Sequence, residues 1–211
     1  MNVNEEKKYI FIHIPKTGGT TISNQLHLKG GRGIAYKGDD FKNYSTQHYN
    51  IPQLLAFNGR LRQDYLWKYF IFTIVRNPWD RFVSEYSQRQ ASGDDKNFKQ
   101  LLEYAEECVN LYNKGIFYNK GVHNKISHFI PQYTFVYFCG MQIPSFVGRF
   151  EKYDDAILYI SSQINYDLDL RKHLNKSDHG HYSKYYNWKT KRKLMKLYKD
   201  DIKLFNYKFE R

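Results

Sequence analysis

The sequence has few cysteines and no long apolar run. Only Cys108 and Cys139 occur among 211 residues, without the spacing of metal ligands, so we expect two reduced packing residues rather than a zinc site or a disulfide framework. No window of about eighteen apolar residues exists, and the polar start "MNVNEEKKY" is unlike a signal peptide. These absences predict a cytoplasmic chain with no stable membrane insertion.

Acidic residues are also in the minority. The chain has 33 Lys and Arg against 21 Asp and Glu, a net charge of +12. This surplus favours a polyanionic partner, which could be a nucleotide, a nucleic acid, a membrane surface or an acidic glycan. No break in composition divides the chain, so we expect one domain over residues 1–211, with residues 1–8 as a flexible N-terminus.

Two apolar segments predict buried strands. Residues 9–14 are rich in β-branched and aromatic side chains and run into Pro15 and two glycines, which indicates a strand, a turn and then a helix at 21–28. Residues 69–75, "YFIFTIV", are too continuously apolar for a strand with one wet face and suit the interior of a parallel sheet. Further strands are expected at 134–138 and 145–150, and further helices at 98–112, 152–164 and 188–205.

The segment after the second strand carries the signals of a helix start. Asn77 can cap the helix, Pro78 fits its first position, and Asp80 adds negative charge to the first turn. Apolar side chains recur at helical spacing toward the sheet, which leaves Ser84 on another face. The alternation of strands and helices predicts an α/β fold that binds its ligand at the carboxyl ends of the strands.

The loop "PKTGGTT" after the first strand carries groups suited to an anion. Two glycines let the backbone approach a phosphate, a lysine adds charge, and three threonines add hydroxyl donors. These residues are Lys16, Thr17, Gly18, Gly19, Thr20 and Thr21. A Walker A loop places its lysine after the glycines, whereas here the lysine comes first. The loop therefore predicts a phosphate cradle unlike that of an ordinary nucleoside triphosphatase.

With this loop the chain resembles sulfotransferase family 2, the carbohydrate sulfotransferases that use 3′-phosphoadenosine-5′-phosphosulfate as donor. This family is related to the uronosyl 2-O-sulfotransferases and to the chondroitin and dermatan 4-O-sulfotransferases. "FIHIPKTGGTT" is similar to the family's 5′-phosphosulfate loop and "FTIVRNPWDRFVSEY" to its 3′-phosphate motif. "FVGRFEKYDDA", "HLNKSDH" and "LYKDDIKLFNY" are similar to later segments. The resemblance implies a P-loop-like three-layer fold with a central parallel sheet flanked by helices.

The resemblance also implies roles for particular residues. Lys16 and the loop that follows it would hold the 5′-phosphosulfate, and Arg76 and Ser84 the 3′-phosphate. Lys176 and Ser177 would add further cofactor contacts. The product would be 3′,5′-bisphosphoadenosine, no metal would be required, and the acceptor would be a hydroxyl of a glycan or glycolipid.

Sulfuryl transfer needs a base for the acceptor hydroxyl, and histidine is the side chain best matched to neutral pH. His48, in "STQHYNIPQLL", stands where the family carries a histidine, so we predict the base there; the alternative is a loop histidine bonded to backbone. His13 fits a buried, hydrogen-bonded histidine. We interpret His179 and His181 as part of a polar loop near the cofactor or acceptor, since two histidines at this spacing make a weak metal site.

Two other classes of protein fit parts of the sequence. A P-loop kinase or nucleotide hydrolase would need a Walker A loop and a magnesium-binding carboxylate at a strand end, and neither is visible. A basic module for nucleic acid would suit the charge and the 20 Tyr, 15 Phe and 3 Trp. Most of these aromatic residues lie inside apolar runs, however, which favours a role in the core.

Overall fold

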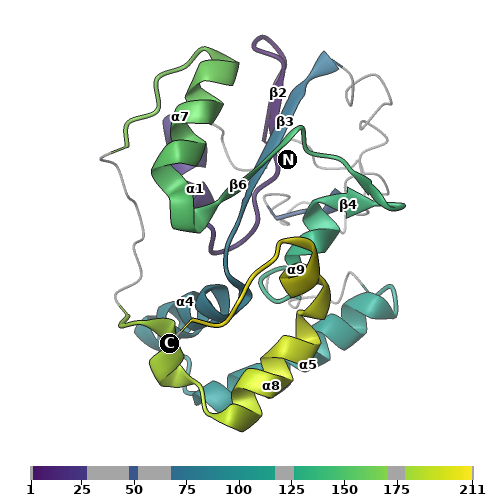
Figure 1. Cartoon of the computed structure of the whole chain (residues 1–211), viewed down its shortest axis with the longest axis vertical. Helices are drawn as coiled ribbons and strands as arrows, with labels where there is room; N and C mark the ends of the chain where they lie inside the picture. Colours follow the sequence, from purple (N-terminus) through teal and green to yellow (C-terminus); the bar gives the residue numbers. More distant parts are fainter. Residues whose placement is uncertain (1, 28–47, 52–67, 117–125, 171–178, 211) are drawn as a thin grey trace, which may run out of the picture. The chain divides into compact units, whose positions relative to one another are not determined.

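The computed structural model describes residues 2–27, 48–51, 68–116, 126–170 and 179–210. The chain forms two compact units (Figure 1). The sheet unit comprises Met1–Val75 and Thr134–Asn175, and the helical unit comprises Arg76–Tyr133 and Lys176–Arg211.

The sheet unit contains a four-stranded sheet in the order β1-β2-β3-β6. Its strands are β1 (Asn2–Asn4), β2 (Tyr9–Phe11), β3 (Phe70–Val75) and β6 (Phe146–Arg149). The β2–β3 and β3–β6 pairs are parallel, and β1 pairs with β2 in the antiparallel direction. The predicted α/β fold with a mostly parallel sheet is confirmed. The antiparallel strand β1 differs from the expectation, because it lies in the segment we expected to be a flexible N-terminus.

Helices α1 (Gly19–Gln25) and α7 (Tyr153–Ile164) pack on one face of this sheet. Alternate side chains of β2 and β3 point into this layer, among them Phe11 and Phe72, whose rings stack 5.1 Å apart. Ile22 of α1 and Ile160 of α7 are fully buried against them. Neighbouring residues that point to the opposite face, such as Ile71, are buried as well. Burial on both faces explains the continuous apolar runs, since each fully buried side chain of this size contributes about 1.5–3 kcal/mol.

Residues 134–138 do not form the single strand that we predicted. The 3-10 helix η2 (Gln132–Phe135) is followed by a hairpin of β4 (Tyr137–Phe138) and β5 (Met141–Gln142). Cys139 and Gly140 connect the two strands with φ of 49° and 77°, the left-handed conformation that a tight hairpin turn requires. Cys139 is therefore exposed at a turn, and the predicted packing role is right only for the buried Cys108.

The helical unit is built from α4 (Pro78–Ala91), α5 (Phe98–Asn113), the 3-10 helix η4 (Tyr182–Tyr185), α8 (Trp188–Leu197) and α9 (Lys199–Leu204). The predicted start of α4 is confirmed, because the side chain of Asn77 accepts a hydrogen bond from the Trp79 amide at 3.1 Å and Pro78 begins the helix. The single helix predicted over 188–205 is interrupted at Tyr198, which has a non-helical φ of −113°.

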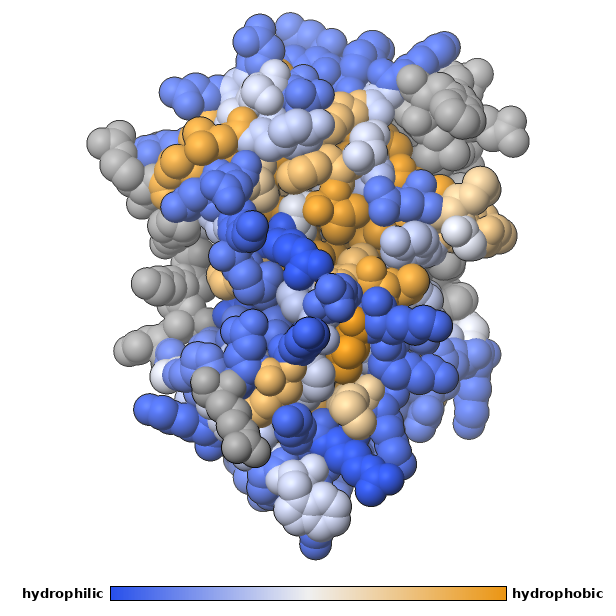
Figure 2. All heavy atoms as spheres, viewed as in Figure 1, coloured by the Kyte–Doolittle hydropathy of each residue, from blue (hydrophilic) through white to orange (hydrophobic). Residues whose placement is uncertain are grey.

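The surface in the view of Figure 2 is mostly hydrophilic and is interrupted by smaller apolar areas. In the part of the chain that the structure describes, no helix combines the length and apolar character needed to cross a membrane.

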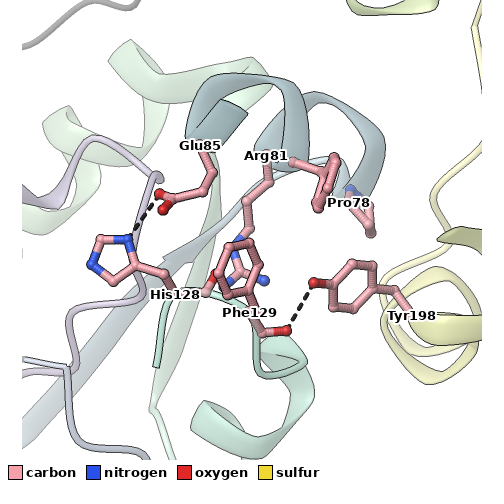
Figure 3. A pocket seen from close by; sticks show the side chains of 7 residues that line it. Pro78, Arg81, Glu85, His128, Phe129 and Tyr198 are labelled. Atoms are coloured by element: carbon pink, nitrogen blue, oxygen red, sulfur yellow. Dashed lines mark hydrogen bonds and ion pairs between the residues drawn. The ribbon is translucent and has the colours of Figure 1, made fainter. Parts of the chain in front are cut away.

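A small pocket in the helical unit is lined by Arg81, Glu85 and Tyr198 (Figure 3). Arg81 is buried and donates to the carbonyl oxygens of His128 and Ile130 at 2.9 and 3.2 Å. The Tyr198 hydroxyl donates to the carbonyl oxygen of Phe129 at 2.8 Å. These bonds attach the backbone of 128–130 to α4 and to Tyr198, the residue between α8 and α9, so these side chains contribute to the packing of the unit.

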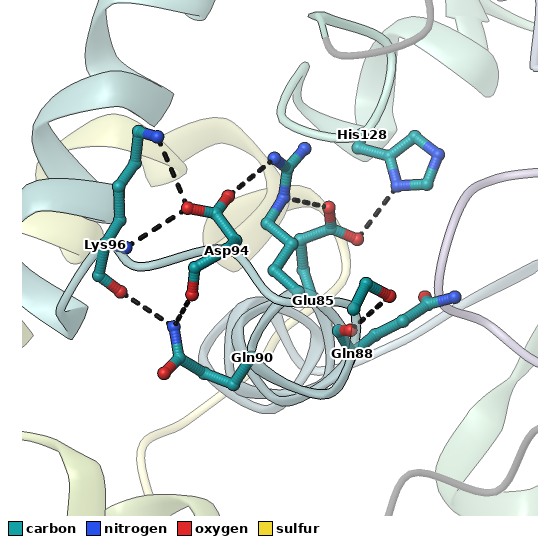
Figure 4. A network of polar contacts seen from close by, with 8 residues as sticks. Glu85, Gln88, Gln90, Asp94, Lys96 and His128 are labelled. Carbon is teal, nitrogen blue, oxygen red and sulfur yellow. Dashed lines mark hydrogen bonds and ion pairs between the residues drawn. The ribbon is translucent and has the colours of Figure 1, made fainter.

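Glu85, on α4, is the centre of a buried charge network (Figure 4). Its carboxylate accepts from Arg89 at 2.6 Å and from His128 at 2.8 Å, and Arg89 also reaches Asp94 at 3.3 Å. Burial by itself raises the pKa of Glu85, but the charges and hydrogen bonds of His128 and Arg89 outweigh it and lower the pKa from 4.5 to about 2.

We predict that Glu85→Gln destabilises the protein in a pH-dependent way. A lowered pKa means that ionised Glu85 stabilises the fold above about pH 4.5 and that this contribution disappears as the pH falls toward 2. The difference between these pKa values corresponds to an upper value of about 3 kcal/mol. Denaturant unfolding followed by circular dichroism should show a deficit at pH 7 that narrows below pH 4.5. Glu107→Gln, which removes a carboxylate at an exposed position on α5, is the control and should not show this pH-dependent loss of stability. A deficit equal at pH 7 and pH 3 would contradict the charge network.

Candidate active site

The loop between β2 and α1 contains two residues with positive φ. Lys16 and Gly18 have φ of 69° and 78°, and Thr17 separates them. Left-handed residues alternating with others turn successive backbone N–H groups toward one side, which creates a concavity for an anion. The Thr17 hydroxyl donates to the Ile14 carbonyl at 2.9 Å and is buried, so this side chain fixes the shape of the loop.

Both glycines of the loop are in close contact with aromatic rings. A Cβ atom on Gly19 would lie 2.2 Å from Cδ2 of His13, and one on Gly18 would lie 2.7 Å from the ring of Tyr153. The Tyr153 hydroxyl, from the start of α7, donates to the Gly18 carbonyl at 3.1 Å. Helix α1 begins here with no side-chain cap and no acidic residue in its first turn. The loop is therefore held by contacts with His13 and Tyr153, which come from outside residues 15–21.

His48 lies beside this loop. Its Nδ1 is 3.1 Å from the carbonyl oxygen of His13, and the two imidazole rings meet edge to face at 4.6 Å. A carbonyl can only accept, so Nδ1 carries the proton and the lone pair of the neutral ring is on Nε2. His13 in turn contacts Gly19, so the chain of contacts from His48 ends at the first residue of α1.

Arg76, directly after β3, is held from both its backbone and its side chain. The side-chain nitrogen of Gln132 donates to the Arg76 carbonyl oxygen at 2.8 Å, and the side-chain oxygen of Gln132 accepts from the Arg76 backbone amide at 2.9 Å. The Arg76 guanidinium donates through Nε to Asp80 at 2.7 Å. Gln132 is itself oriented by Asp201, which accepts from the backbone amides of Gln132 and Tyr133 at 2.8 Å each. Burial raises the pKa of Asp201 to about 6, although these hydrogen bonds act in the opposite direction.

Ser84 and His179 complete the polar residues around the start of α4. Ser84 is buried, more than we expected for a face not used in packing. His179 Nε2 is buried without a hydrogen-bond partner among the described residues and lies 4.0 Å from Oδ1 of Asp80, while its Nδ1 donates to the Gly180 carbonyl at 2.9 Å. His181 is exposed and accepts from the Ser183 amide, so the two histidines belong to different environments.

A family model described as the sulfotransferase family matches residues 1–208. The chain belongs to the sulfotransferase family. Its members are enzymes that transfer a sulfuryl group, and this is therefore the general activity of the chain. No curated protein and no solved structure matches the sequence.

The structure of this sulfotransferase brings some of the predicted site residues together. Lys16, Thr17, Gly18, Gly19, Thr20, Thr21 and His48 all lie in the sheet unit, and Arg76 and Ser84 lie in the helical unit. The predicted cofactor contacts Lys176 and Ser177 fall outside the described residues. No cluster of three or more potential metal-binding side chains occurs within the described ranges.

Three residues that support the site were missed at the level of sequence. Tyr153 lies in "FVGRFEKYDDA", which was noted only as a family segment, and its contact with Gly18 joins positions 135 residues apart. Gln132 bonds the Arg76 backbone across 56 residues, and Asp201 bonds Gln132 across 69 residues. No local pattern marks such residues, because their roles depend on how the elements pack.

We predict that Gly19→Ala in this sulfotransferase lowers the free energy of unfolding by about 1–3 kcal/mol, because the added methyl group overlaps the ring of His13. Gly180→Ala is the matched control, since its Cβ would meet nothing within 4 Å, and it should change stability by less than about 0.5 kcal/mol. Denaturant titration measures both values.

The same substitution in a His13→Ala background tests the cause. Removal of the ring should reduce the cost of Gly19→Ala. An equal cost with and without the His13 ring would show that this contact does not explain the glycine.

Proposed function

We propose that the enzyme transfers the sulfuryl group of 3′-phosphoadenosine-5′-phosphosulfate to a hydroxyl of a carbohydrate acceptor. The observation that carries the proposal is the lysine-first loop of residues 15–21. In this loop Lys16 and Gly18 take positive φ values, and the first turn of α1 that follows carries no acidic residue. When bound, the donor supplies the sulfuryl group and leaves as 3′,5′-bisphosphoadenosine.

The loop residues fit the 5′ end of such a donor. Backbone N–H groups from Lys16 to Thr20 and the positive end of α1 stabilise phosphate oxygens. The two glycines let the rings of His13 and Tyr153 pack directly against this backbone. The Thr17 hydroxyl is already used by Ile14, so Thr17 acts through its backbone. Thr20 and Thr21 add hydroxyl groups at the first turn of α1, and Lys16 neutralises the charge that develops on the bridging oxygen of the leaving group.

Arg76 and Ser84 fit the 3′-phosphate. Asp80 and Gln132 hold the Arg76 guanidinium and backbone in one orientation, which reduces the entropy that binding would otherwise cost. Asp80 also repels an incoming phosphate, and the Arg76 charge and the start of α4 have to offset that repulsion. From the family resemblance we further assign Lys176 and Ser177 to the donor.

His48 is the base of the proposed reaction. Its Nδ1–H donates to the His13 carbonyl, which orients the ring and places the lone pair on Nε2. The acceptor hydroxyl gives its proton to Nε2 while its oxygen forms the new bond to sulfur. The bond between sulfur and the bridging oxygen breaks, and the electron pair remains on the departing phosphate beside Lys16.

A carbohydrate acceptor is supported by the resemblance to glycan-modifying enzymes and by the net charge of +12, which suits an anionic glycan. A kinase-like reaction is less well supported. The loop has the opposite order of lysine and glycines, and the strand β3 is followed by an arginine rather than a metal-binding carboxylate.

The donor is tested by ligand-induced stabilisation and by transfer. The bisphosphate without metal should raise the melting temperature more than ATP with magnesium does, and labelled sulfate should pass from the donor to members of a glycan panel. Lys16→Ala should retain the fold and lose about two to three orders of magnitude in transfer rate. A stronger response to ATP with magnesium, or undiminished transfer by the variant, would overturn the proposal.

Arg76→Ala should weaken binding of the 3′-phosphate of the donor and leave binding of its 5′ end largely unchanged. Loss of a charged hydrogen-bonded partner should weaken the bisphosphate by about 2–5 kcal/mol. Adenosine 5′-phosphosulfate, which lacks the 3′-phosphate, should be affected much less and serves as the internal control. Calorimetric titration of both ligands gives the comparison, and equal losses would mean that Arg76 does not recognise the 3′ end.

His48→Asn should remove the base and keep the positioning contact. The Asn side-chain amide can replace Nδ1 as donor to the His13 carbonyl but provides no basic nitrogen at the position of Nε2. We expect a loss in turnover of about 10²–10⁴ with unchanged affinity for the bisphosphate. Wild-type activity should rise with pH through the histidine range, near pH 6.5 for an unperturbed ring. A variant that keeps the wild-type rate from pH 5 to 9 would exclude His48 as the base.

A further inference from the structure

Helix α8 presents an outward face that combines cations with large apolar side chains. Trp188, Arg192, Met195 and Lys196 recur at spacings of three, four and seven residues and so share one side of the helix, with Lys189 at its edge. Trp188 is 68% exposed and Met195 is 43% exposed. The opposite side of α8 carries the fully buried Leu194. The outward side chains are therefore not needed for packing of the helical unit.

The cations on this outward face have no carboxylate partner within the described residues. Lys193, at the border with α5, pairs with Glu106 at 2.8 Å, and Lys99 pairs with Glu103 at 3.8 Å. These two pairs neutralise Glu103 and Glu106, which both lie on α5. Among the described residues, Lys189, Arg192 and Lys196 take part in no ion pair of this kind. Lys189 instead lies over the ring of Trp188 at 5.6 Å.

The positive charge is concentrated along the chain as well as in space. Residues 188–199 contain six Lys and Arg and no acidic residue. In the view of Figure 2 the lower part of the surface, where Figure 1 shows α8, is largely hydrophilic. A basic surface that also exposes Trp188 and Met195 suits an anionic partner that accepts apolar groups.

We propose that this outward face of α8 binds the surface of an anionic lipid membrane. Phosphate and carboxylate headgroups complement Lys189, Arg192 and Lys196, while Trp188 and Met195 enter the boundary between headgroups and acyl chains. Nucleic acids and glycans would also attract the cations, and their bases or sugar rings could stack on Trp188. Met195 favours lipid, because an unbranched thioether gains little from a hydrated polymer and gains from entering an apolar layer. The binding is peripheral and does not depend on the sulfuryl donor or acceptor.

The expected strength follows from the number of cations. Each Lys or Arg close to an anionic leaflet strengthens binding about fivefold, so three cations give roughly a hundredfold preference over neutral lipid. The preference should fall with salt, because the Debye length shortens from about 10 Å at 0.1 M to about 3 Å at 1 M.

Co-sedimentation of the full chain with vesicles tests the proposal. Vesicles of phosphatidylcholine alone are compared with vesicles in which a third of the lipid is phosphatidylserine. We expect binding to the anionic vesicles only, loss of that binding at high salt, and a blue shift of tryptophan fluorescence that disappears in Trp188→Phe. Equal binding to both kinds of vesicle, or binding to neither, would overturn the proposal.

A charge-matched pair of variants shows whether α8 is responsible. Arg192→Glu combined with Lys196→Glu should weaken anionic-vesicle binding by more than about 25-fold. Lys114→Glu combined with Lys152→Glu changes the net charge equally at exposed positions elsewhere and should bind like the wild type. Melting curves establish that both variants are folded. Equal losses in the two variants would mean that only net charge matters and would contradict a site on α8.

A separate titration distinguishes the lipid membrane from the competing partners. A sulfated glycan and a single-stranded oligonucleotide are titrated into the protein without vesicles. If either binds through Arg192 and Lys196 more tightly than the anionic vesicles do, the face belongs to a polymer and the lipid assignment is wrong.

Discussion

The parallel pairing of β2 with β3 is the constraint on which the candidate site depends. The register aligns Phe11 with Phe72, and the bonds continue beyond β2, where the Ile12 amide donates to the Phe72 carbonyl at 3.0 Å and the Thr73 hydroxyl donates to the Ile12 carbonyl at 2.7 Å. Since both strands run in the same direction, the loop of residues 15–21 begins at the edge of the sheet where β3 ends. Burial of both faces of the sheet makes this arrangement rigid.

Two histidines, His13 and His48, lie beside the loop of residues 15–21 at this edge of the sheet. His13 is buried on the exit of β2, where its ring packs against Gly19 and leaves no space for a larger residue. Its carbonyl then sets the tautomer of His48. His13 thus contacts the loop through its ring and orients the ring of His48 through its backbone carbonyl.

The helical unit uses buried polar groups in a different way. Glu85, Arg81 and Asp201 are buried, and each is satisfied by several specific partners within that unit. Such groups are costly when one partner is lost, so they define a single arrangement of α4, α8 and the segment 126–133. The outward face of α8 has the opposite character, since its cations and apolar groups take no part in that scaffold.

Local signals in the sequence determined the elements that carry the chemistry. The apolar runs predicted β2 and β3, the Asn-Pro pair predicted the start of α4, and the lysine-first glycine loop predicted the phosphate cradle. The predictions of β2, β3 and the start of α4 were confirmed, because their causes act between residues close together in the chain through side-chain alternation and helix capping. The phosphate cradle stays a prediction.

Only the tertiary structure decided which residues support that chemistry. The contact of His48 with His13 spans 35 residues, that of Gln132 with Arg76 spans 56, and that of Tyr153 with Gly18 spans 135. The turn at Cys139 and the break at Tyr198 also departed from local expectation. In each case the deciding free energy comes from packing and hydrogen bonds between distant segments, which outweigh the weak local preferences that a sequence pattern reports.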